Sequence, residues 1–286
     1  MAGRRWTKEE DAVMLRQYQT VGNSILVERL NRTRPAIHMR ARMLGIKKPV
    51  LSVNHNFFDS WSEKMAWLLG FFAADGCVKC NRKANVVSFK QKERYIIERI
   101  KSLLGSGHSV VEQHDDHDTR HELSYTSQHT YSRLCELFGC DVQAKSMTLL
   151  FPEVPTEYGR HFIRGCIDGD GSLFWHNTGV PYVKFVSGSE AFARGLWNCV
   201  QNSTGVVGNL RKEKIWVVEY PGIKAKAFSS WLYNDAQISL DRKRRLAKEF
   251  YEWIPKHYWK KSVTDKMREM FPWLTSKRHS EEFSFA

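Results

Sequence analysis

The sequence predicts an α+β protein in which a small three-helix domain precedes two similar units, each ordered helix, strand, strand, helix, strand, strand, helix. An internal repeat at a nearly constant offset, and short segments of alternating apolar and polar residues, predict the two units. A basic helical pattern predicts the N-terminal domain. We therefore expect a domain over 1–48, a linker over 49–62, repeat units over 63–155 and 156–254, and a basic tail over 255–286.

The first helix of the N-terminal domain is predicted to begin after Thr7. Thr7 and Glu10 have the spacing of a capping box, in which each side chain satisfies a backbone N–H of the other. Val13, Leu15 and Tyr18 are then expected to face inward. A short second helix is expected in "SILVERL", beyond the Gly-Asn pair that ends the first one.

The third helix is predicted from an N-cap at Thr33 to a stop at Gly45. Its buried side is expected to hold Ile37, Ala41 and Leu44. A three-helix unit with a basic last helix is typical of helix-turn-helix DNA readers, whereas a solvated helix packed on the rest of the protein is the alternative. The candidate DNA contacts on this helix are Arg34, His38, Arg40 and Arg42.

The N-terminal stretch "RRWTKEEDAVMLRQY", with "RTRPAIHMRARMLGI" after it, resembles Myb/SANT-like domains. The opening Trp-Thr-x-Glu-Glu-Asp carries the resemblance, while later tryptophans of the Myb pattern are missing. The resemblance implies a helical DNA-binding domain at this end of the chain.

The internal repeat aligns "LLGFFAADG", which ends in Asp75-Gly76, with "IRGCIDGDG", which ends in Asp170-Gly171. The two aspartates are 95 residues apart. Three further landmark pairs follow at offsets of 96, 100 and 98 residues, namely Phe89 and Phe185, Gly105 and Gly205, and Lys145 and Lys243. Four landmarks at nearly constant offset indicate the duplication of one unit rather than chance.

Alternating segments such as "NVVSFKQ" and "KIWVVEY" predict half-buried antiparallel strands. In the first unit we expect strands over 77–82, 85–91, 109–114 and 121–127, and in the second over 172–177, 181–187, 206–212 and 215–220. Cys77 and Cys80 form a single C-x-x-C and are interpreted as strand residues, because a zinc site requires four ligands. Two such units side by side form a pseudo-twofold pair of sheets.

Net charge favours an anionic partner. Lys and Arg number 44 against 31 Asp and Glu, a net charge of +13, and without an amphipathic basic anchor this favours nucleic acid over a membrane. No apolar run reaches the roughly 18 residues that span a bilayer, and "MAGRRWTKEED" has no signal-peptide core. We expect an intracellular protein without a secretion signal, in the cytoplasm, the nucleoid or an organelle matrix, with no membrane partner.

Asp75 and Asp170 stand where two apolar helices are predicted to end, with Gly70 and Gly165 five residues earlier. Small residues at that spacing let two backbones approach closely, so we expect the two carboxylates to meet between the units. Carboxylates held close repel each other unless a cation lies between them or one is protonated. Hard oxygen ligands suit Mg²⁺, and metal held beside a basic surface is an arrangement that cleaves phosphodiesters.

The paired motifs resemble those of the LAGLIDADG homing endonucleases of the single-chain, two-motif kind, and the match extends from about Trp61 to Trp253. The second motif is close to the family signature, and the first has Ala73 where an acid often stands but keeps Asp75. The resemblance implies Mg²⁺- or Mn²⁺-dependent double-strand cleavage of a long DNA site with short 3′ overhangs. It also implies saddle-shaped antiparallel sheets that read bases in the major groove, in a monomer with internal pseudo-twofold symmetry.

The same resemblance implies roles for individual residues. The last acids, Asp75 and Asp170, are metal ligands, and the residues before them, Ala74 and Gly169, belong to the metal site. A lysine in each half polarises water or stabilises developing charge, and these positions are Lys145 and Lys243. In the second half, Arg242, Arg244 and Arg245 could share or replace the role of Lys243. A polar residue at the end of the second strand orients the attacking water: Gln91 in the first half, with the shorter Ser187 at the matching place.

DNA-contacting residues are expected on one face of the strands and in the adjoining loops. Arginine reads guanine bidentately, Asn or Gln reads adenine, and loop lysines more often bind phosphate. The candidates are Lys79, Asn81, Arg82, Lys83, Lys90 and Lys92 in the first half, and Trp175, His176, Asn177, Lys184, Asn209, Arg211 and Lys212 in the second.

A sequence-specific DNA endonuclease with an added N-terminal DNA-binding module is therefore the leading hypothesis. One alternative is an RNA maturase that assists intron splicing, with intron RNA as a partner. The other is a non-catalytic DNA-binding regulator on the same fold. Both acids are present, which argues against a loss of activity but leaves a dual role open.

Overall fold

The computed structural model describes residues 4–81, 84–114 and 118–254 and has the α+β fold that the sequence predicts. The chain forms two compact units, Met1–Ser52 and Val53–Ala286, and each is described by itself. The candidates Arg82 and Lys83 and the expected tail over 255–286 lie outside the described residues. Within the described part, none of the helices is long and apolar enough to cross a membrane.

Unit Met1–Ser52 contains α1 (Lys8–Gln17), α2 (Asn23–Leu30) and α3 (Arg34–Met43). The capping box is confirmed, because Glu10 N–H donates to Thr7 Oγ1 at 3.2 Å and Thr7 N–H donates to Glu10 Oε2 at 3.0 Å. The expectation for Leu15 is wrong: it is 55% exposed, because Met14 and Tyr18, one turn apart, occupy the inward side of α1. The small core consists of Met14, Tyr18, Leu26, Leu30, Ile37 and Ala41.

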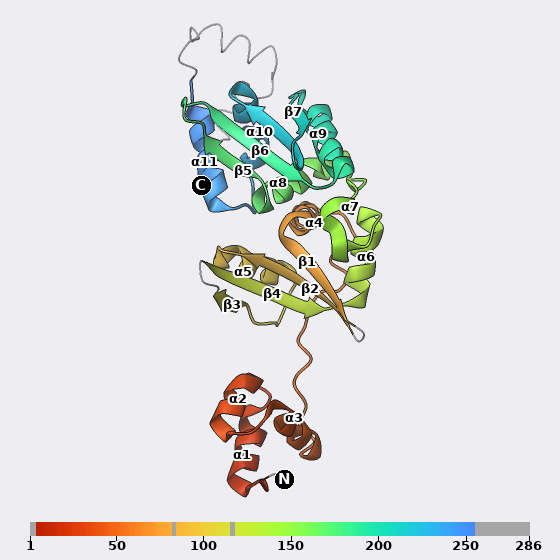
Figure 1. Ribbon diagram of the computed structural model, residues 1–286, viewed down its shortest axis with the longest axis vertical. Coiled ribbons are helices and arrows are strands. Elements are labelled where there is room, and N and C mark those ends of the chain that lie inside the picture. The colour runs from red at the N-terminus through yellow and green to blue at the C-terminus, as the bar shows by residue number, and fades with distance from the viewer. Residues whose placement is uncertain (1–3, 82–83, 115–117, 255–286) are drawn as a thin grey trace. The chain divides into compact units, whose positions relative to one another are not determined.

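Unit Val53–Ala286 contains two four-stranded antiparallel sheets with the same topology (Figure 1). The first has the order β1-β2-β4-β3, with β1 (Gly76–Asn81), β2 (Ala84–Gln91), β3 (Val111–His114) and β4 (Thr119–Thr126). The second has the order β5-β6-β8-β7, with β5 (Ser172–Trp175), β6 (Pro181–Ser187), β7 (Asn209–Lys212) and β8 (Trp216–Pro221). Identical strand orders follow from the duplication.

Two strands begin later than expected, β3 at Val111 rather than 109 and β7 at Asn209 rather than 206. In the second case side chains occupy the backbone groups that a strand would use. Val206 N–H donates to Thr204 Oγ1 at 3.0 Å, and the Gly208 carbonyl accepts from Trp197 Nε1 at 2.8 Å.

Helices cover one face of each sheet and share one continuous apolar core. The first half has α4 (Glu63–Asp75), α5 (Arg94–Leu103), α6 (Gln128–Phe138) and the short α7 (Lys145–Thr148). The second has α8 (Gly159–Gly169), α9 (Glu190–Thr204), α10 (Ile223–Tyr233) and α11 (Asp241–Glu252), and so it has two long helices after its last strand. Two 3-10 turns, Val142–Ala144 and Thr156–Tyr158, complete the described elements.

Helices α4 and α8 pack against each other between the two sheets (Figure 1). A Cβ atom added to Gly70 would lie 2.0 Å from the Phe162 carbonyl oxygen, and one added to Gly165 would lie 2.0 Å from the Trp67 carbonyl oxygen. The two backbones therefore touch directly at these glycines, as their spacing predicts. This contact sets the positions of the residues that end both helices.

Candidate active site

The two aspartates of the repeated motifs come together where α4 and α8 end. A Cβ atom added to Gly169 would lie 3.4 Å from Asp75 Oδ2 and 2.3 Å from Ala74 Cβ, so the two helix ends are in contact. Asp75 is half-buried, whereas Asp170 is exposed at the rim of a cavity of about 240 Å³. The expectation that the carboxylates meet between the halves is confirmed.

The charge of this carboxylate pair is not fully compensated. Burial raises the pKa of Asp75 to about 6, and repulsion from Asp170 adds to the effect, while Lys243 and Lys145 oppose it. The pKa of Asp170 is also raised, because protein atoms surround its carboxylate although part of the residue is exposed, and both lysines oppose this shift as well. A further cation at this place would favour the ionised form of both groups.

The two lysines expected near the site each bind the end of one motif helix. Lys145 Nζ donates to the carbonyl oxygens of Phe72, Ala73 and Ala74, at 2.5, 2.6 and 3.3 Å. Lys243 Nζ repeats this pattern with the carbonyl oxygens of Ile167, Asp168 and Gly169, at 2.5, 2.7 and 3.3 Å. A cation at a helix C-terminus satisfies unpaired carbonyls and the negative end of the dipole.

Burial lowers the pKa of Lys145 to about 8, and the two aspartates act against this shift. The pKa of Lys243 is likewise lowered to about 8, mainly by burial. The neighbouring arginines do not share these contacts in the described structure: Arg242 Nε donates to Glu93 Oε1 at 2.7 Å, and Arg244 and Arg245 line clefts beside α11. Lys243 is thus the structural counterpart of Lys145.

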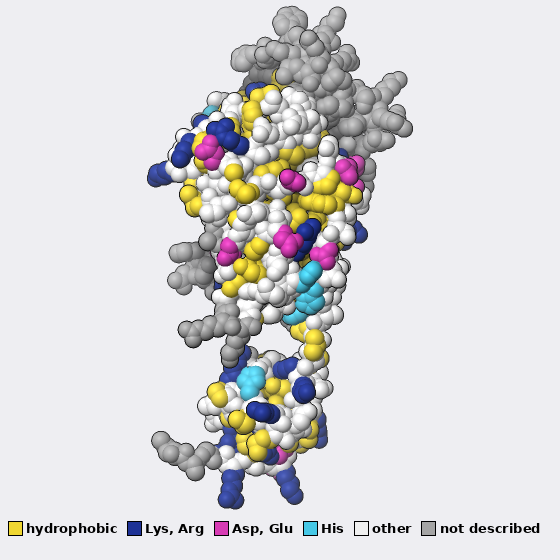
Figure 2. Space-filling model, turned by 90° about the vertical axis from the view of Figure 1, so that its right-hand side faces the viewer, with side chains coloured by type: hydrophobic (Ala, Val, Ile, Leu, Met, Phe, Trp, Pro, Cys, Tyr) yellow, Lys and Arg dark blue, Asp and Glu magenta, His cyan; other side chains and the backbone are white. Residues whose placement is uncertain are grey.

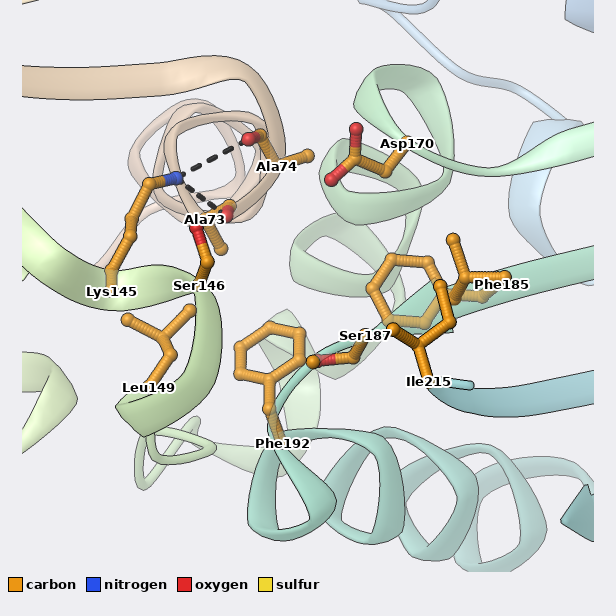
Figure 3. A pocket seen from close by; sticks show the side chains of 12 residues that line it. Ala73, Ala74, Lys145, Ser146, Leu149, Asp170, Phe185, Ser187, Phe192 and Ile215 are labelled. Atoms are coloured by element: carbon orange, nitrogen blue, oxygen red, sulfur yellow. Dashed lines mark hydrogen bonds between the residues drawn. The ribbon is translucent and has the colours of Figure 1, made fainter. Parts of the chain in front are cut away.

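The polar residues at the ends of β2 and β6 differ between the halves. Gln91 Nε2 donates to Asp75 Oδ2 at 2.7 Å. Ser187 accepts instead from the Ser189 backbone N–H at 3.1 Å and lines the cavity beside Asp170. In Figure 3, Ser187 and Asp170 lie on opposite sides of this cavity, and Ala73 and Ala74 lie between Lys145 and Asp170. Asp75 therefore has an amide donor that is not repeated at Asp170 among the described residues.

A third aspartate, Asp168, received no role from the sequence, and the structure gives it a central position. It is fully buried, and its carboxylate accepts from Trp67 Nε1 and from the Tyr233 hydroxyl, both at 2.9 Å. These bonds tie the last turn of α8 to α4 and α10. The available signal was an acid inside an apolar helix two residues before Asp170, because a buried carboxylate needs partners.

The sheet residues expected to contact DNA fall into two groups. Alternate burial along β4 and β6, carried across the sheets by the strand register, leaves one open face on each sheet, which carries Lys79, Lys90, Lys184, Asn209 and Arg211. Two of these form ion pairs, Lys90 with Glu122 at 3.4 Å and Arg211 with Glu219 at 2.8 Å and Glu213 at 2.9 Å. Other candidates lie at strand ends: Lys92, paired with Asp118 at 2.5 Å, the exposed His176 and Asn177, and Lys212 over the Trp216 ring.

Trp175 lies on the opposite, helix-covered face. Its Nε1 donates to Glu249 at 3.0 Å, and its ring meets the Phe250 ring edge-on at 5.0 Å between centroids. Strand alternation explains this correction, because Trp175 has the same parity as the buried Leu173. The structure does not support Trp175 as a DNA contact.

The basic residues of α3 also differ from one another. Arg34 and Arg42 are exposed. Arg40 Nε donates to Asp11 Oδ1 at 2.7 Å, and this ion pair binds α3 to α1. His38 is exposed and hydrogen-bonds Asn23 at 3.2 Å.

Two halves of equal topology, joined through glycine-mediated helix packing and ending in paired carboxylates and lysines, define a pseudo-symmetric α+β protein with one composite site. The sequence matches the family model described as the LAGLIDADG-like domain over residues 62–139 and 157–250, and the chain belongs to this family. The resemblance of its two motifs is thereby confirmed.

Solved structures similar to this chain include the homing endonuclease I-WcaI bound to its DNA recognition sequence, with 12% identity, a TM-score of 0.48, and coverage of 67% of this chain and 90% of that one. I-DmoI in complex with DNA and Ca has 13% identity, a TM-score of 0.46, and coverage of 68% and 99%. The N-terminal LAGLIDADG domain of DUF199/WhiA has 12% identity, a TM-score of 0.43, and coverage of 64% and 86%. No curated protein matches the chain.

Proposed function

We propose that this protein is a sequence-specific, divalent-metal-dependent endonuclease that cuts both strands of DNA and leaves short 3′ overhangs. The observation that carries the proposal is the pairing of Asp75 and Asp170, one from each half, at the ends of α4 and α8. The two strands of a duplex are themselves related by a twofold axis. A pseudo-twofold pair of acids can therefore present one carboxylate to each strand.

The residues at this site fit a hard divalent cation such as Mg²⁺ or Mn²⁺. The donor set consists of the Asp75 and Asp170 carboxylates, with the backbone at Ala74 and Gly169 beside them, and such oxygen ligands suit Mg²⁺. Burial raises the pKa of both acids, so a bound cation would stabilise their ionised, metal-binding forms. A divalent cation bound between them would neutralise the pair and polarise the scissile phosphodiester.

The protein's own groups orient and stabilise this centre. Gln91 fixes the Asp75 carboxylate through its amide, and Lys145 and Lys243 hold the helix ends that carry the acids. With pKa values that burial lowers to about 8, both lysines are still mainly protonated at neutral pH. This supports a role for them in stabilising charge on the reacting phosphate.

DNA binding is assigned to the open faces of the two sheets, where Lys79, Lys184 and Asn209 are available. Unit Met1–Ser52 is proposed as a second, Myb-like DNA-binding module. It contains 11 Lys and Arg against four Asp and Glu, and Lys and Arg dominate the charged side chains on the face that Figure 2 shows. Arg34 and Arg42 are its proposed phosphate contacts, whereas Arg40 stabilises the unit through Asp11.

A non-catalytic DNA-binding regulator is the second candidate function. The asymmetry of the halves favours it, since Ser187 stands where the other half has Gln91, and Ala73 where the other half has Asp168. A protein that only binds DNA needs no matched pair of reaction centres.

Selection from a randomised DNA library with Mg²⁺ separates the two functions. Wild type is compared with Asp170→Asn and with Asp235→Asn, a control at an exposed aspartate with a φ of 52°, which asparagine also tolerates. The endonuclease requires cut ends with one fixed 3′ overhang from wild type and Asp235→Asn, and none from Asp170→Asn. Enrichment of one uncut sequence by all three proteins would instead establish the regulator.

A further inference from the structure

The open face of the second sheet carries an apolar patch at its end nearest the candidate active site. The patch consists of Val186, Ile215 and Val217. Val186 and Val217 are register partners in β6 and β8, and Ile215 stands two residues before Val217 and so has the same parity. Val186 and Ile215 line the cavity that Asp170 also lines, and Figure 3 shows Ile215 beside Ser187 there. The patch therefore adjoins the candidate active site.

The side chains of the patch are not part of the core of the unit. The core formed by the described residues contains Phe185 and Val218, which are the neighbouring register pair on the other face of β6 and β8, and it includes none of the patch. Ile215 is 40% exposed, and Val186 is half-buried. Covering this apolar surface with a ligand would be favourable, because the surface is then removed from water.

Charged residues stand at the corresponding positions of the first sheet. Lys90 lies 96 residues before Val186, which is the offset of the repeat at this point. Its register partner Glu122 forms an ion pair with it at 3.4 Å, and the exposed Arg120 stands two residues before Glu122. Since both sheets have the same strand order, an apolar patch at this place is not a requirement of the fold. A contact specific to the second half would explain the difference.

The surroundings of the patch favour a DNA base as its ligand. Lys184, Asn209 and Arg211 lie on the same open face, and Arg211 is the register partner of Val217 in β7. Basic and amide groups suit phosphates and base edges, so a duplex bound there places base edges over the patch. The major groove displays one apolar group, the C5-methyl of thymine, which apolar side chains contact. An aliphatic patch among polar groups is therefore complementary to thymine.

We propose that Val186 and Ile215, supported by Val217, bind the C5-methyl group of a thymine in the major groove and so make the protein prefer an A·T pair at that position. The proposal rests on the proposed function, because it requires a DNA duplex on the open sheet faces. It gives the second half a base contact that the first half does not share, since Lys90 and Glu122 occupy the matching place.

The test removes the methyl group alone, by replacing thymine with uracil. The full chain first selects duplexes from a randomised library in EDTA, so that binding is measured without cleavage. Each thymine of the selected duplex is then replaced in turn by uracil, and the dissociation constants are measured by fluorescence anisotropy. Loss of the methyl that the patch binds should weaken binding about four-fold, which is the value for one buried methyl group.

Variants of the patch identify which thymine it binds. Val186→Thr and Ile215→Thr keep a β-branched side chain but make it polar, and each should reduce the difference between the thymine and uracil duplexes to less than about two-fold. The control Val207→Thr makes the same change at a residue that is 43% exposed in the loop before β7. The control should keep the four-fold difference of wild type.

The outcomes separate this proposal from the proposed function. A difference that both patch variants retain, or a selected duplex in which no thymine methyl affects binding, would overturn the proposal and leave sequence-specific cleavage standing. Enrichment of no sequence would overturn both. Cleavage of the selected duplex with Mg²⁺ tests the proposed function separately, because the binding measurements need no metal.

Discussion

Replacing Gly70 with alanine tests whether the backbone contact between α4 and α8 builds the composite site. The new Cβ would lie 2.0 Å from the Phe162 carbonyl oxygen, where an ordinary contact is about 3.5 Å. The helices must therefore separate by about 1.5 Å at this point. Overpacking costs about 1–3 kcal/mol, and rigid backbone on both sides places this case at the upper end. The higher helix propensity of alanine offsets about 0.5–1 kcal/mol of this cost, so the free energy of unfolding is expected to fall by about 2 kcal/mol in total.

The assay is urea denaturation of wild type, Gly70→Ala and the control Gly159→Ala. In the control, on the first residue of α8, the new Cβ meets only side-chain atoms, Cys199 Sγ at 3.3 Å and Ser203 Oγ at 3.9 Å, and a change within about 0.5 kcal/mol is expected. Displacement of the two acids by about 1 Å should also lower any cleavage rate by about 100-fold. If Gly70→Ala is as stable as Gly159→Ala, the spacing of α4 and α8 is not set by glycine, and the packing argument fails.

Three further predictions concern the charged groups of the site. The pKa of Asp75 is raised to about 6 from 3.8, so its contribution to stability is complete below pH 3.8 and is lost as pH rises through about 6. Urea denaturation in EDTA should therefore show a smaller difference in unfolding free energy between pH 4 and pH 7 for Asp75→Asn than for wild type. Lys243→Met leaves the last carbonyls of α8 without their donor and should cost about 2–3 kcal/mol, as measured by urea denaturation; an unchanged midpoint would contradict the capping role. Because none of the described residues is the counterpart of Gln91 at Asp170, the two DNA strands should be cut at unequal rates. Ser187→Gln should bring the rates closer in a strand-specific nicking assay, and equal rates in wild type would refute this.

Much of the fold could be predicted from the sequence because it repeats. The strand order of the second half follows from that of the first, and the glycines five residues before each acid indicate a close helix pair without any coordinates. These signals are local, since helix ends, capping residues and strand alternation depend on neighbours a few residues away. The three N-terminal helices could be predicted for the same reason.

The errors and omissions concern contacts between distant segments. Parity with the apolar Leu173 places Trp175 on the inner face of β5, but only the packing of α11 shows that Glu249 and Phe250 hold its ring there. The composition of "LDRKR" allowed any of several basic residues to reach the site, and only the packing of α11 selects Lys243. The partners of Asp168 lie 101 and 65 residues away, so no local pattern indicates them.

By itself, the sequence determined the duplication, the fold class, the family and the two acids that meet at the centre, because each is encoded in residue types at short or regular spacing. The tertiary structure alone decided how those acids are surrounded. It placed Gln91 on one acid only and brought Lys145 and Lys243 to the helix ends. The physical reason is that burial, charge and hydrogen bonding at a site depend on distances between segments far apart in the chain, and folding sets those distances.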